Sequence, residues 1–138
     1  MTWTRIKQTN NNYLVAYEDK VLSTTPATNN VDTSVIPDGF LVPGKNFIVG
    51  IYARNTSSSG AVDIDVLGSF ASAGTYGVLK ADLIASATIG GEFFCANYTI
   101  NTFGSAPFMK IRIDPDDSGM ATQTYRFYIM QDVDGLGT

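Results

Sequence analysis

The chain has 138 residues, the length of one domain, and with 44% hydrophobic and 12% aromatic residues it has the composition of a globular protein. Only 16% of its residues are charged, against a typical value of about 25%, so the polar surface must be largely Thr, Ser, Asn and Gly, which favours strands and turns. The net charge of −4 argues against a nucleic-acid partner, and without an apolar run of about 18 residues or a signal-peptide core we expect no membrane span and no export from the cytoplasm.

Residues 1–12 are polar and end in three asparagines, which is typical of an N-terminal arm that is ordered only on contact with a partner. Trp3 is the one large aromatic residue in this arm. It either packs onto the core of its own chain or docks on a partner, and both alternatives stay open. Residues 13–138 are predicted to form a single β-sandwich domain.

Alternating side chains predict a first strand over 13–21, and breakers at 37–39 and 43–44 lead to the central stretch 46–70. In that stretch, period-two alternation predicts two half-buried strands that form a hairpin around the polar turn 55–60. The residues expected on the buried faces are Phe47, Val49, Ile51 and Ala53 in the first strand, and Val62, Ile64, Val66 and Phe70 in the second.

The second half of the chain continues with short elements. A strand is predicted over 75–80, while 81–87 is either one helical turn or an extended segment. Further strands are predicted over 92–100, 108–113 and 123–133. The last has bulk on both faces, which is typical of a central strand or of one covered by another subunit. Together these seven or eight strands predict an all-β fold, an antiparallel β-sandwich that is either jelly-roll-like or immunoglobulin-like.

No residue pattern indicates a catalytic, cofactor or metal site, and we expect no enzyme activity. The chain has no histidine, which removes a Ser-His triad and His-based metal sites, and it has no phosphate-binding glycine motif. Asp63 and Asp65 share one strand face, which is more typical of exposed carboxylates than of a catalytic pair. Cys95 is the only cysteine and follows two phenylalanines, so we expect a buried, inert thiol.

Two further patterns have alternative interpretations. The stretch 114–119 matches the opening of a calcium-binding loop, but Tyr125 occupies the twelfth position, so an acidic hairpin turn is the better interpretation. Exposed tyrosines can stack on sugars, although packing in the core or between subunits is the more frequent fate of such residues. The tyrosines in question are Tyr52, Tyr76, Tyr98 and Tyr125.

Three stretches together resemble the small all-β proteins that decorate the heads of tailed bacteriophages, called cement or head auxiliary proteins. They are Ile36-Pro-Asp-Gly-Phe-Leu-Val-Pro-Gly-Lys45, Val62-Asp-Ile-Asp-Val-Leu-Gly-Ser-Phe70, and Met109-Lys-Ile-Arg-Ile-Asp114 followed by Tyr125-Arg-Phe-Tyr-Ile-Met-Gln131. The resemblance implies a β-sandwich that trimerises and binds the outside of an expanded capsid, where it clamps adjoining major capsid subunits.

The resemblance also implies partners and a location. The partners are the major capsid protein and further copies of this chain, with no nucleic acid and no membrane, and the protein is part of the virion exterior after synthesis in the host cytoplasm. The N-terminal arm reaches a neighbour in this interpretation, so Trp3, Arg5 and Lys7 are expected as capsid or inter-subunit contacts. The alternative is a carbohydrate-binding β-sandwich module, or a phage fibre or receptor-binding domain, that uses a tyrosine-lined face.

Overall fold

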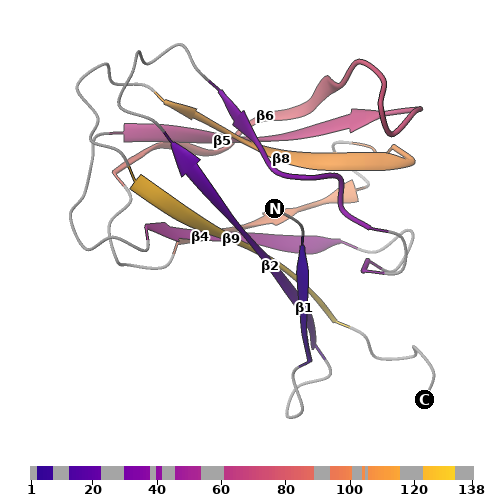
Figure 1. Cartoon of the computed structure of the whole chain (residues 1–138), viewed down its shortest axis with the longest axis horizontal. Coiled ribbons are helices and arrows are strands. Elements are labelled where there is room, and N and C mark those ends of the chain that lie inside the picture. Colours follow the sequence, from indigo (N-terminus) through magenta and orange to yellow (C-terminus); the bar gives the residue numbers. More distant parts are fainter. Residues whose placement is uncertain are drawn as a thin grey trace.

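Two antiparallel β-sheets packed face to face make up the fold, as the computed structural model shows (Figure 1). The structure describes residues 3–7, 13–22, 30–37, 40–41, 46–53, 61–88, 94–100, 104, 106–115 and 123–132. Its nine strands are β1 (Thr4–Lys7), β2 (Tyr13–Leu22), β3 (Val31–Asp32), β4 (Phe47–Ala53), β5 (Ala61–Ser69), β6 (Gly77–Thr88), β7 (Phe94–Tyr98), β8 (Phe108–Pro115) and β9 (Gln123–Asp132). The predicted antiparallel β-sandwich is confirmed, with β1, inside the predicted arm, as an additional strand.

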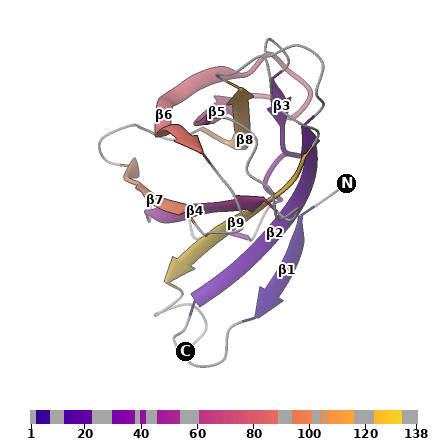
Figure 2. The ribbon, with the colours of Figure 1, turned by 90° about the vertical axis from the view of Figure 1, so that its left-hand side faces the viewer.

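Consecutive strands mostly lie in different sheets (Figure 2). The five-stranded sheet has the order β1-β2-β9-β4-β7, and the four-stranded sheet has the order β3-β8-β5-β6. Among the described strands, only β1 with β2 and β5 with β6 are sequence neighbours that pair with each other. The chain therefore crosses repeatedly from one sheet to the other.

This topology corrects two predicted hairpins. The strands predicted to pair within 46–70 are β4 and β5, but β4 pairs with β7 and β9 while β5 pairs with β6 and β8. Likewise, β8 and β9 lie in different sheets, so the acidic stretch 114–119 does not close a hairpin, and its residues 116–119 lie outside the described part. Alternation reveals which side of a strand is buried but not which strand lies beside it.

The core lies between the sheets, and the predicted alternation is confirmed for most strands. Phe127 is buried in β9, the central strand of its sheet, as its bulk on both faces predicts. The prediction fails for Phe70, which lies beyond the end of β5 and is 92% exposed. The buried residues on the two predicted faces are Phe47, Val49, Ile51, Val62, Ile64 and Val66, and the side chain of the predicted Ala53 lies outside the described part.

Strand β6 settles the ambiguous segment 81–87 as extended. Asp82 has a φ of 55°, in the left-handed region, and the register between β5 and β6 shifts at several points. The backbone N–H of Asp82 donates a hydrogen bond of 2.8 Å to Oδ1 of Asp65 on β5. We infer that this bond holds a β-bulge, in which one strand carries an extra residue and twists more strongly.

Candidate functional site

The connection between β5 and β6, residues 70–76, presents the most exposed large hydrophobic side chain of the described chain. We call this segment the β5–β6 tip. Phe70 is 92% exposed there, compared with 52% for Val78 at the start of β6 and 49% for Val21 at the end of β2. The tip therefore offers an aromatic ring to solvent at the end of the sandwich.

Internal hydrogen bonds brace the β5–β6 tip. Oγ of Ser69 accepts the N–H of Ala71 at 3.2 Å, and the carbonyl of Ala71 accepts the N–H of Gly74 at 3.1 Å. The hydroxyl of Tyr76 then donates to the carbonyl of Ser72 at 2.9 Å. Because these bonds all lie within the eight residues 69–76, we infer that the loop holds its shape without help from a partner.

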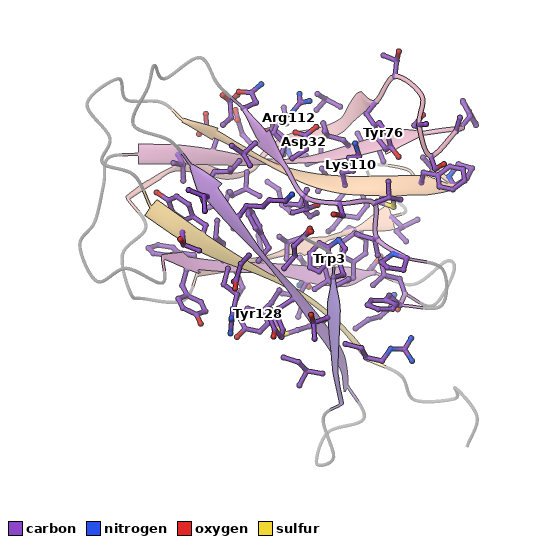
Figure 3. The ribbon with its side chains drawn as sticks, viewed as in Figure 1. Trp3, Asp32, Tyr76, Lys110, Arg112 and Tyr128 are labelled. Carbon is purple, nitrogen blue, oxygen red and sulfur yellow. The ribbon has the colours of Figure 1, made fainter. Side chains whose placement is uncertain are left out.

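Strand β8 supports the same end of the four-stranded sheet. Nζ of Lys110 lies 4.2 Å from the ring centroid of Tyr76, which is a cation–π contact (Figure 3). The register places Lys110, Leu67 and Val78 in one row across β8, β5 and β6. Leu67 in the middle of this row is fully buried, so the base of the tip is packed while Phe70 stays exposed.

The predicted contact residues Trp3, Arg5 and Lys7 lie at the edge of the five-stranded sheet. Trp3 is 5% exposed and belongs to the core, and its indole Nε1 donates to the carbonyl of Ser34 at 2.9 Å between the two sheets (Figure 3). This is the first of its two sequence alternatives, packing onto its own chain. Arg5 is exposed on β1, with its guanidinium 4.7 Å from the ring centroid of Phe40. Lys7 ends β1, and its side chain is outside the described part.

The buried carboxylate of Glu18 binds Ser34, the same residue that accepts the indole N–H of Trp3. Glu18 on β2 is 1% exposed, and its two oxygens accept the N–H and the hydroxyl of Ser34, both at 2.7 Å. Nζ of Lys20 lies 3.9 Å from the same carboxylate. Since Ser34 also accepts the indole N–H of Trp3, one residue joins the N-terminal segment to both sheets. We call Trp3, Glu18 and Ser34 the Ser34 cluster, and its role is to stabilise the fold.

Three tyrosines gather on the outer side of the five-stranded sheet. This tyrosine face consists of Tyr17, Tyr52 and Tyr128 with the ion pair Asp19 and Arg126. The ring centroids of Tyr17 and Tyr128 are 6.1 Å apart, and those of Tyr52 and Tyr128 are 6.0 Å apart. All three tyrosines are half-buried, and Figure 3 shows Tyr128 on the side of its sheet that points away from the core.

Of these three tyrosines, only Tyr52 is a candidate sugar-stacking residue by sequence. Alternation within β2 and β9 places Tyr17 and Tyr128 on one side of each strand, but only the strand register of the folded sheet shows that they are neighbours. Tyr98 and Tyr125 are fully buried, as expected of core tyrosines. Burial raises the pKa of Tyr98, whose hydroxyl donates to the carbonyl of Gly104 at 2.6 Å.

The outer side of the four-stranded sheet is charged instead. Nε of Arg112 on β8 donates to Oδ1 of Asp32 on β3 at 2.6 Å, and Arg112 pairs in register with Asp65 on β5 (Figure 3). The hydrogen bond with Asp32 is the main reason why the pKa of Arg112 is raised. The expectation that Asp65 is exposed is wrong, because it is 7% exposed and bonded to Asp82, whereas Asp63 is half-buried.

Cys95 is exposed, so the predicted buried thiol is also wrong. Its neighbours Phe94 and Ala96 are more buried, and the alternation of β7 turns Cys95 and Asn97 outward. Within the described ranges, no group of three or more His, Cys, Asp or Glu side chains is placed to hold a metal ion. No helix in this part of the chain is long and apolar enough to cross a membrane.

No protein-family model matches the chain, and no curated protein matches its sequence.

Proposed function

We propose that this protein is a non-enzymatic virion structural protein, a decoration or cement protein that binds the outer surface of a phage capsid and stabilises it. The observation that carries this proposal is the braced β5–β6 tip with Phe70 at 92% exposure. Burying a Phe side chain contributes about 1.5–3 kcal/mol, and on an exposed loop tip nearly all of that contribution is left for a partner. Aromatic residues seated in a partner's pocket are the usual anchors of protein interfaces.

The scaffold supports the proposal through its strand order. We propose that the sandwich is a jelly roll. The strand orders β2-β9-β4-β7 and β3-β8-β5-β6, with β1 added at one edge, support this type. An immunoglobulin domain instead orders its strands ABED and CFG. Of the three stretches that resemble head decoration proteins, the second lies in β5, and the two parts of the third lie in β8 and β9. In the first stretch, 36–45, none of the described residues belongs to a strand.

Many copies acting together explain how a small contact stabilises a shell. We propose that three copies of this chain associate, and that each inserts Phe70 into an apolar recess of the major capsid protein on the virion exterior. Linked copies bind with an avidity far above the affinity of one contact. Arg5 and Lys7 are proposed as rim contacts, which influence the association rate and its salt dependence more than the affinity.

The experiment is co-sedimentation with expanded heads of the phage that encodes the chain, with the mass of the free protein measured by light scattering. We expect a trimer in solution and saturable binding to the heads. We expect Phe70→Ala to weaken binding at least tenfold, in line with an anchor contribution of about 2 kcal/mol. The matched control is Val21→Ala, which removes an exposed apolar side chain from another strand and should change binding less than twofold. A monomer that ignores the heads would refute the proposal.

A further inference from the structure

The tyrosine face has a layout that the decoration function does not use. Tyr17 on β2 lies directly opposite Tyr128 on β9, and Gly50 on β4 lies on the other side of Tyr128. Gly50 carries no side chain and is itself buried, so neighbouring groups cover it. Tyr52 is diagonal to Tyr128, with the two rings inclined at only 21° to each other. The result is a shallow aromatic surface across three neighbouring strands.

A hydrogen-bonded network holds these rings in place. Nε and Nη2 of Arg126 donate to the two carboxylate oxygens of Asp19 at 2.8 and 3.0 Å, and the guanidinium carbon lies 4.1 Å from the ring centroid of Tyr17. Tyr128 is hydrogen-bonded to both Arg126 and Tyr52. Burial raises the pKa of Tyr128 above the ordinary value of a tyrosine. A surface whose aromatic rings are already fixed loses less conformational entropy on binding a ligand.

The chemistry of the surroundings selects the class of ligand. The charges of Asp19 and Arg126 cancel in their bidentate pair. Thr4 and Asn97, exposed at the two edges of the sheet, are polar and uncharged, and the row beside Tyr128 on the same face holds the half-buried apolar residues Ile6, Met130 and Ile48. A sugar ring presents a face of C–H groups, which packs on the negative face of an aromatic ring, and a rim of hydroxyls, which bond to amides, hydroxyls and charged side chains.

From this arrangement we infer that the tyrosine face is a binding site for a neutral oligosaccharide. The rings of Tyr17, Tyr52 and Tyr128 stack against successive sugar units, and the polar groups around them bond the hydroxyls. The face is an open sheet surface, so the ligand is an extended chain of several sugars instead of a single enclosed one. This activity is separate from capsid docking, because the β5–β6 tip belongs to the other sheet.

The test uses the full chain and a panel of neutral tetra- to hexasaccharides of hexoses and N-acetylhexosamines. Cys95 is the only cysteine and pairs in register with Gly50, so an environment-sensitive fluorophore attached to it reports on this face. We expect at least one oligosaccharide to change the fluorescence saturably. Calorimetry on the unlabelled protein should give the same affinity.

Variants assign the binding to the tyrosines. We expect Tyr52→Ala and Tyr17→Ala to weaken oligosaccharide binding at least tenfold while the unfolding temperature shows that each is folded, and Tyr52→Phe to retain most of the binding. Phe70→Ala should bind the oligosaccharide unchanged. The inference would be overturned if the wild-type protein bound no member of the panel at millimolar concentration. It would also be overturned if both alanine variants bound the oligosaccharide as tightly as the wild-type protein. A third outcome would also overturn the inference: the tyrosine variants lose binding to phage heads, and the wild-type protein binds no oligosaccharide. This face would then belong to a protein partner.

Discussion

Trp3 and Phe70 are two large aromatic residues with opposite positions in the fold, and of the two only Phe70 lies where its sequence pattern does not predict it. Trp3 lies in a polar segment beside the N-terminus, yet it is 5% exposed and bonded to Ser34. Phe70 continues the alternation of a buried strand, yet it is 92% exposed at the β5–β6 tip. The comparison teaches that the N-terminal segment holds the sandwich together, while the tip is the part of the chain that is available to a partner.

Removing Trp3 should have the largest effect on stability. We expect Trp3→Ala to lower the free energy of unfolding by about 3–5 kcal/mol, because it empties a core site and removes the indole N–H bond to Ser34. Urea unfolding followed by circular dichroism measures the change. Trp3→Phe, which keeps a ring, should cost clearly less. A loss below about 1 kcal/mol in Trp3→Ala would show that the residue does not belong to the core.

Removing the carboxylate of Glu18, which binds Ser34 beside Trp3, should have the next largest effect on stability. Glu18→Ala should lower the free energy of unfolding by about 1–3 kcal/mol, because it removes both oxygens that accept the N–H and the hydroxyl of Ser34 and leaves these two donors without their partner. Lys20→Gln removes only the 3.9 Å ion pair and is the control, with an expected change of about 0–1 kcal/mol. Equal effects of the two substitutions would contradict the role given to the buried carboxylate.

Two glycines that face each other at the base of the β5–β6 tip give a matched pair. A Cβ on Gly68 would lie 2.7 Å from Cβ of Ala106 and 2.7 Å from Cδ1 of Leu79, so Gly68→Ala should cost about 1–3 kcal/mol of unfolding free energy. Gly77 is its register partner and has no atom within 4 Å of such a Cβ, so Gly77→Ala should change stability by less than about 0.5 kcal/mol. Thermal unfolding of both variants checks the difference, and equal midpoints would refute it.

Phe70 should have the smallest effect on stability. Phe70→Ala is expected to change the free energy of unfolding by less than about 0.5 kcal/mol, because the exposed ring gives up little contact when it is removed. Chemical denaturation measures this value. A loss above about 2 kcal/mol would mean that the ring is packed in solution, and the contrast with Trp3 would disappear.

Much of the fold follows from local patterns. Period-two alternation is enough to find the core-facing side of β4 and of the first half of β5, since successive side chains of a strand point to opposite faces. Strand partners depend on contacts between distant segments, so the expected β4–β5 hairpin is wrong. The β5–β6 hairpin does pair, and its tip is where the alternation of β5 ends.

The candidate sites follow from the sequence only in part. Cys95 has aromatic neighbours, and their bulk suggests burial for the whole segment, but the pleat of β7 turns it outward. The tyrosine face needs the register between β2, β9 and β4, which brings Tyr17, Tyr128 and Tyr52 together over more than a hundred residues of chain. No short stretch of the sequence indicates that these three tyrosines lie together. Arg5 and Lys7 stay predicted contacts.

The most direct test of the central claim is a titration of expanded phage heads with the wild-type protein and with Phe70→Ala in parallel, with Val21→Ala as control. The number of bound copies per head and the affinity are measured by sedimentation. We expect wild type and Val21→Ala to bind saturably with similar affinity, and Phe70→Ala to need at least a tenfold higher concentration while it is equally stable. Wild-type protein that leaves the heads undecorated, or a Phe70→Ala variant that binds as well as wild type, would contradict the account.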